Sequence, residues 1–113
     1  MVAIQWQGGV LSLLDQGAYP QEEKWLTCNT WEETAQALAT PAVQEEKVAA
    51  IAAAYGYAQA AIAAQDKLGT DAFQAALDQA KEQLLASRPG SRDVAAALAF
   101  VETPPEAYTK NAD

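Results

Sequence analysis

The chain lacks the residues on which most catalytic and metal sites depend. It has no histidine and a single cysteine, Cys28, in 113 residues. Histidine is the most frequent general base and metal ligand, and one cysteine cannot form an internal disulfide. No Cys/His cluster and no Asp-rich calcium loop is present, so we expect neither a metal ion nor a cofactor. Cys28 is predicted to be a small buried hydrophobic residue.

Basic residues are also scarce. The chain has seven Lys and Arg residues and 15 Asp and Glu residues, which gives a net charge of −8. Such a surface repels nucleic acid and anionic lipid, so we expect neither as a partner. The N-terminus has no signal-peptide pattern, and the apolar segment 48–64 is mostly alanine, which favours a buried helix over a membrane span. These features predict a cytoplasmic protein whose residues 1–113 form a single domain.

Short apolar runs with turn signals between them occupy residues 1–28. The segments 2–6 and 10–15 flank a Gly8-Gly9 pair, which predicts a β-hairpin. Trp25 and Leu26 favour a third strand over residues 24–28.

The hydrophobic period then changes to that of helices, over residues 30–101. Thr30 and Glu33 form a capping box that opens the first helix. Thr40 and Pro41 are expected to begin a second helix, which ends near Gly69. Thr70 and Ser91 are expected to cap two more helices, and residues 102–113 form a tail. The buried stripe expected for the second helix consists of Val48, Ile51, Tyr55, Ala58 and Ile62, and that for the third of Phe73, Leu77, Ala80 and Leu84. The predicted fold class is therefore α+β, with a small N-terminal antiparallel sheet of about three strands followed by about four helices.

Several segments, in this order, resemble the methylthioribose-1-phosphate isomerase family, which is related to translation initiation factor 2B. They are Ile4-Gln5-Trp6, the run 11–16 followed by Pro20, the run 28–33, the run 51–56 and the run 85–89. Together they extend over about residues 2–98. The resemblance implies a family with a small N-terminal domain and a larger domain that carries the catalytic cysteine and aspartate. It implies that this chain corresponds to the N-terminal domain and stops before the larger one, so that Cys28 is not the family's nucleophile.

The resemblance also implies two substrate contacts in the N-terminal domain. The first is an Arg-Gly-Ala-Pro segment, and the matching residues here are Gln44, Glu45, Glu46 and Lys47. Two carboxylates repel a phosphate, so we interpret this stretch as a degenerate family site that has become the exposed surface of a helix beginning near Pro41.

The second contact is an Arg-Pro-Thr segment, of which Arg88 and Pro89 remain here. Arg88, Arg92 and Ser91 lie near an expected helix start, where backbone amides favour an anion, and they are the candidate ligand-binding residues. The alternative is that Arg88 pairs with Asp93 or with a carbonyl at the end of the preceding helix.

Three functions follow from this reading. The first is a non-enzymatic, catalytically incomplete scaffold or interaction module, which forms a homodimer or binds a protein partner through its alanine-rich helices. The candidates for a face that binds such a partner are Trp31, Tyr55, Tyr57 and Phe100, although core packing is the role favoured for most of them. The alternatives are a domain that binds a small anion such as a sugar phosphate, and one part of a split isomerase of methionine salvage.

Overall fold

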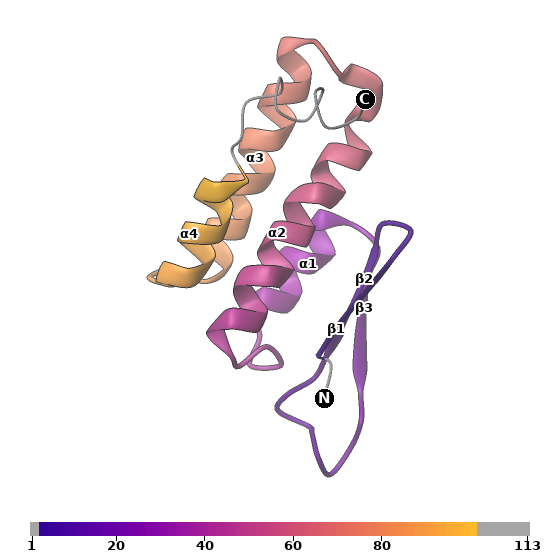
Figure 1. Ribbon diagram of the computed structural model, residues 1–113, viewed down its shortest axis with the longest axis vertical. Coiled ribbons are helices and arrows are strands. Elements are labelled where there is room, and N and C mark those ends of the chain that lie inside the picture. Colours follow the sequence, from indigo (N-terminus) through magenta and orange to yellow (C-terminus); the bar gives the residue numbers. More distant parts are fainter. Residues whose placement is uncertain (1–2, 102–113) are drawn as a thin grey trace.

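A three-stranded sheet followed by four helices makes up the computed structural model, which describes residues 3–101 (Figure 1). This arrangement confirms the predicted α+β class. The elements are β1 (Ile4–Gln7), β2 (Val10–Leu14), β3 (Trp25–Cys28), α1 (Trp31–Leu38), α2 (Glu46–Ala63), the short 3₁₀ helix η1 (Gln65–Lys67), α3 (Asp71–Ser87) and α4 (Arg92–Phe100). The predicted tail, residues 102–113, lies outside the described residues.

The hairpin between β1 and β2 forms where the sequence predicted it. Gly8 and Gly9 have φ values of 59° and 87°, the left-handed conformation that a two-residue hairpin turn requires at both central positions. The strands are antiparallel, and Gln7 pairs with Val10 at the turn. The sheet order is β1-β2-β3, so the central strand is β2. Its Leu11 and Leu13 are fully buried, because this face of the sheet lies against the helices.

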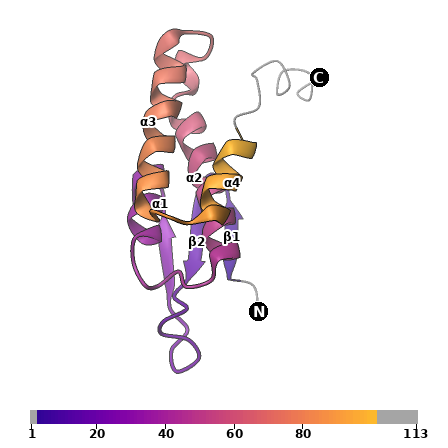
Figure 2. The same cartoon turned by 90° about the vertical axis from the view of Figure 1, so that its left-hand side faces the viewer.

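Helix α2 is the centre of the molecule. It contacts β2 on one side and the other three helices on its remaining sides. Figures 1 and 2 show three layers, with the sheet against α1 and α2, and with α3 and α4 on the side of α2 away from the sheet. A helix enclosed in this way needs small side chains wherever a neighbouring helix crosses it closely.

The buried face of α2 differs from the expected one. Ile51 and Ile62 are 51% and 47% exposed, so the predicted stripe is wrong at these two positions, whereas Val48 and Tyr55 pack partly buried against the core. The buried positions instead carry small or polar side chains, at Ala49, Ala52, Ala53, Gly56, Gln59 and Ala60. At Gly56 a Cβ atom would lie 3.0 Å from both Leu84 Cδ2 and Thr34 Cγ2, so side chains of α1 and α3 approach α2 closely at this point. The stripe predicted for α3 is correct at Leu77, Ala80 and Leu84, all of which are buried.

A buried polar contact joins the sheet to α1 and α2. Gln59 is 4% exposed, and its Nε2 donates to the carbonyl oxygens of Gly9 at 3.0 Å and Cys28 at 2.9 Å. Its Oε1 accepts from Thr34 Oγ1 at 2.5 Å. All polar atoms of this side chain therefore have partners, as burial requires. Cys28 itself is 2% exposed, which confirms the prediction of a buried residue.

Three of the four predicted helix starts are confirmed by their caps. Thr30 accepts from the amide of Glu33, Thr70 from that of Phe73, and Ser91 from that of Val94. The fourth prediction, a helix from Pro41, is wrong, because α2 begins at Glu46. Thr40 Oγ1 donates to the Ala37 carbonyl and so extends the end of α1 instead of opening α2.

None of the helices within residues 3–101 has the length and apolar character needed to cross a membrane.

Candidate functional site

The candidate site lies where the end of α1, the start of α2 and the loop between α3 and α4 meet. An open hollow of about 520 Å³ occupies this junction. It is lined by Leu38, Ala39, Glu46 and residues 87–93. The fold thus brings one of the four residues of the degenerate family site together with all three predicted ligand-binding residues, Arg88, Ser91 and Arg92. Gln44, Glu45 and Lys47 do not line the hollow.

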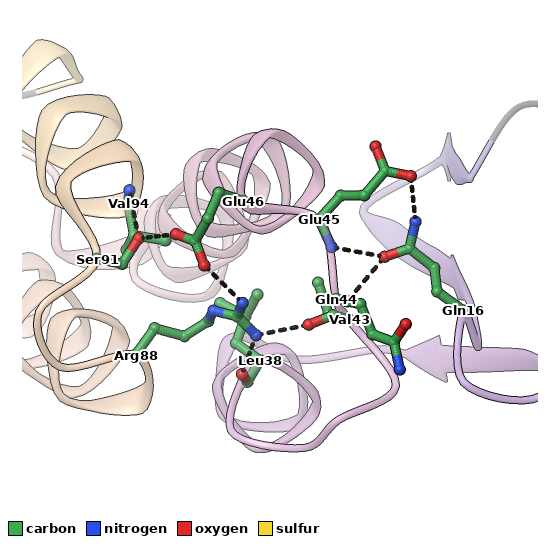
Figure 3. Close-up of polar contacts among 9 residues, drawn as sticks. All are labelled: Gln16, Leu38, Val43, Gln44, Glu45, Glu46, Arg88, Ser91 and Val94. Atoms are coloured by element: carbon green, nitrogen blue, oxygen red, sulfur yellow. Dashed lines mark hydrogen bonds and ion pairs between the residues drawn. The ribbon is translucent and has the colours of Figure 1, made fainter.

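Arg88 is held by three acceptors from outside its own helix. Its Nη1 donates to the carbonyl oxygens of Leu38 at 3.1 Å and Val43 at 2.6 Å, and its Nη2 donates to Glu46 Oε1 at 2.8 Å (Figure 3). The side chain is 16% exposed. A cation at the last carbonyl groups of α1 is favoured by the helix dipole. Arg88 therefore links the end of α1 to the start of α2. These partners differ from the alternatives considered for Arg88, which were Asp93 and a carbonyl group at the end of α3.

The carboxylate of Glu46 is shared between Arg88 and Ser91. One oxygen accepts from the guanidinium group and the other from the hydroxyl of Ser91, which also accepts from the amide of Val94 at 3.2 Å (Figure 3). The hydrogen bonds from Ser91 and Arg88 lower the pKa of Glu46 below its ordinary value, because both stabilise the ionised form. An anionic group thus already lies between Arg88 and Ser91, two of the three residues predicted to bind an anion.

Gln16 holds the stretch before α2. Its Oε1 accepts from the amides of Gln44 at 2.8 Å and Glu45 at 3.1 Å, and its Nε2 donates to Glu45 Oε1 at 3.0 Å (Figure 3). The sequence had suggested that all four residues, 44–47, lie on a regular helix. In the structure only Glu46 and Lys47 are helical, and Gln44 and Glu45 precede the helix. Sequence reasoning missed Gln16, because a glutamine in a loop carries no signal of its own.

Arg92 and Lys47 are exposed. Arg92 is the first residue of α4 and lines the hollow. Among the residues that the structure describes, no group of three or more His, Cys, Asp and Glu side chains is arranged to hold a metal ion.

Of the four candidates for an apolar partner face, Trp31, Tyr55 and Tyr57 are partly buried against the core and Phe100 is exposed. Tyr55 stacks on Trp6, with ring centroids 4.6 Å apart, and Trp31 packs partly buried beside Ala60, Leu77 and Ala80. Phe100 is 83% exposed at the end of α4. Binding of a partner and dimerisation stay predictions.

Comparisons with known proteins give consistent matches. Methylthioribose-1-phosphate isomerase from Parasynechococcus marenigrum is 34% identical over 105 residues, which are 93% of this chain and 28% of that protein. The enzyme of the same name from Pseudomonas putida is 48% identical over 56 residues, which are 50% of this chain and 16% of that protein. No family model matches the chain.

Solved structures share the fold. The 5-methylthioribose 1-phosphate isomerase of Pyrococcus horikoshii superposes with a TM-score of 0.81 at 23% identity, over 94% of this chain and 30% of that one. Subunit delta of translation initiation factor eIF-2B from A. fulgidus superposes with a TM-score of 0.72 at 28% identity, over 86% of this chain and 28% of that one. The chain therefore spans less than a third of the length of the proteins that it matches.

These matches correct the expectation of a non-enzymatic protein. These relatives are named as isomerases, so the chain is related to a family of enzymes. The expectation rested on the lack of histidine, on the degenerate contact at residues 44–47, and on treating these 113 residues as acting without the larger catalytic domain. Proteins more than three times as long can carry their reacting groups outside the matched segment.

Proposed function

Because the chain is related over most of its length to the methylthioribose-1-phosphate isomerase family, we propose that it forms part of an aldose–ketose isomerase. The substrate class is a ribose 1-phosphate with a 5-methylthio group, and the process is methionine salvage. The observation that carries the proposal is the identity of 34% over 93% of the chain to a named isomerase. The shared fold supports it.

In this proposal the chain contributes a wall of the substrate site and the reacting groups lie elsewhere. Isomerisation moves a proton between two neighbouring carbons, which requires a positioned acid and base. The carboxylates that line the hollow are Glu46 and Asp93, and Glu46 is already bound to Arg88 and Ser91. The groups that transfer the proton then belong to the part of the enzyme that the chain does not match.

A chimaeric enzyme tests the proposal. The matched 105-residue segment of the Parasynechococcus marenigrum isomerase is replaced by the corresponding residues of this chain. Conversion of methylthioribose 1-phosphate to its ketose is followed by ³¹P NMR. The parental enzyme and a variant without the segment are the positive and negative controls.

We expect the chimaera to isomerise the substrate and the variant without the segment to be inactive. The same chimaera with Glu46→Ala is measured in parallel, because Glu46 occupies the hollow. The proposal is overturned when both chimaeras fold, as judged by circular dichroism and by the parental elution volume, and neither isomerises the substrate.

A further inference from the structure

At the junction of α1, α2 and α4, the donors of Arg88 and Ser91 and the two amides before α2 are bound to internal oxygens, whereas Arg92 is exposed at the edge of the hollow. The guanidinium group of Arg88 binds two carbonyl groups and the carboxylate of Glu46. The hydroxyl of Ser91 binds the second oxygen of that carboxylate. The amides of Gln44 and Glu45, which precede α2, bind the side-chain oxygen of Gln16.

We propose that the carboxylate of Glu46 is an internal acceptor that holds an oxyanion site closed, in the place that a phosphate group of a sugar phosphate would take between Arg88 and Ser91. The inference deepens the proposed function and rests on it for the class of ligand. The addition is that the Glu46 carboxylate of this chain competes with the phosphate group for Arg88 and Ser91.

The geometry of the carboxylate is the first argument. Its two oxygens separately accept from a guanidinium nitrogen and a hydroxyl group, which is also how an oxyanion is held by an arginine and a helix N-terminal serine. Ser91 caps a nine-residue helix, α4, whose first amides and positive dipole end lie beside the same point.

Pre-organisation is the second argument. Arg88 is fixed by the carbonyl oxygens of Leu38 and Val43, which do not depend on Glu46. Removal of the carboxylate therefore leaves the guanidinium group in place, with Nη2 directed into the hollow. Glu46, in contrast, is an exposed side chain in the first turn of α2 and can turn away into solvent.

An internal group that occupies the site multiplies the association constant of the ligand by the fraction of molecules in which that group is displaced. An internal group that occupies the site nine-tenths of the time weakens binding about tenfold. We therefore expect Glu46→Ala to tighten binding by about tenfold or more.

The test is a titration of the complete chain with inorganic phosphate and, separately, with ribose 5-phosphate. Binding is followed through the amide ¹H–¹⁵N signals of residues 91–94 and by calorimetry. Glu45→Ala is the matched control, because it removes the same charge from the neighbouring position, where the carboxylate accepts from Gln16 and does not reach Arg88. Circular dichroism melting verifies that each variant is folded. Glu46→Gln, which removes the charge and keeps the size, takes the place of Glu46→Ala if that variant does not fold.

The proposal is supported when Glu46→Ala binds at least tenfold more tightly than both the wild-type chain and Glu45→Ala, with shifts at residues 91–94. Tighter binding of ribose 5-phosphate than of phosphate then indicates additional contacts with the sugar. Equal affinities in all three proteins, no binding in any of them, or an equal gain in both variants overturns it. A failure here with an active chimaera rejects only the closed site, whereas an inactive chimaera with phosphate binding rejects only the isomerase assignment.

Discussion

Replacing Gln59 by leucine tests how far one buried side chain holds the sheet to the helices. The substitution keeps the side-chain volume roughly constant and removes three hydrogen bonds, to Gly9, Cys28 and Thr34. Each such bond contributes about 1 kcal/mol net, and carbonyl groups left buried without a donor add to the loss. We therefore expect the free energy of unfolding to fall by about 3 kcal/mol.

Such a loss is large for a domain of this size, because total stability is about 5–15 kcal/mol. The midpoint of thermal unfolding should fall by about 12 °C or more. Urea unfolding followed by tryptophan fluorescence and by far-ultraviolet circular dichroism measures the change, since the three tryptophans lie in β1, β3 and α1.

Gln74→Leu is the matched control. Gln74 is exposed on α3 and its side chain makes one bond, to Asp78 at 2.9 Å. The same chemical change there should alter stability by no more than about 0.5 kcal/mol. If Gln59→Leu costs less than about 1 kcal/mol, or no more than Gln74→Leu, the role given to the buried amide is wrong.

Two further outcomes are expected. Gly56→Val should lower the free energy of unfolding in urea by about 2 kcal/mol, because even the added Cβ would lie 3.0 Å from Leu84 and Thr34. The control Ala63→Val, on the exposed side of α2, should cost about 0.5 kcal/mol or less. Equal losses would contradict close packing at Gly56. The lowered pKa of Glu46 means that its ionised form stabilises the fold above the ordinary value of 4.5 and that this contribution disappears as the pH falls through the lower folded-state pKa. Thermal melts below pH 4.5 should therefore show a steeper loss of stability for the wild-type chain than for Glu46→Gln, and parallel curves would count against the contact.

Local signals in the sequence predicted most of the fold. The Gly8-Gly9 turn and the caps at Thr30, Thr70 and Ser91 depend on residues within four positions of one another, so their spacing is informative. Thr40 failed as a cap because its hydroxyl bonds back to the end of α1. The actual start of α2 follows a stretch that Gln16 holds through the amides of Gln44 and Glu45, and a local pattern does not contain this distant contact.

Burial on α2 could not be predicted from periodicity, because that method assigns the core to the bulkiest side chains. Here the helix is surrounded, and close approach selects alanine and glycine for the contacts while isoleucines face outward. The candidate site was predicted only in part for a similar reason. Arg88, Ser91 and Glu46 were all named, but not as partners, because Glu46 is more than 40 residues from the other two in sequence. Gln16 is likewise 28 and 29 residues from the two amides that it binds.

The sole thiol of the chain offers a natural probe of motion. Cys28 ends β3 beneath α1 and is 2% exposed, and burial is the main reason why its pKa is raised. An alkylating reagent needs both access and a thiolate, so it reacts only in molecules whose sheet has lifted away from the helices. The labelling rate of the unmodified protein would then report the fraction of molecules in which that region is open, without any engineered tag.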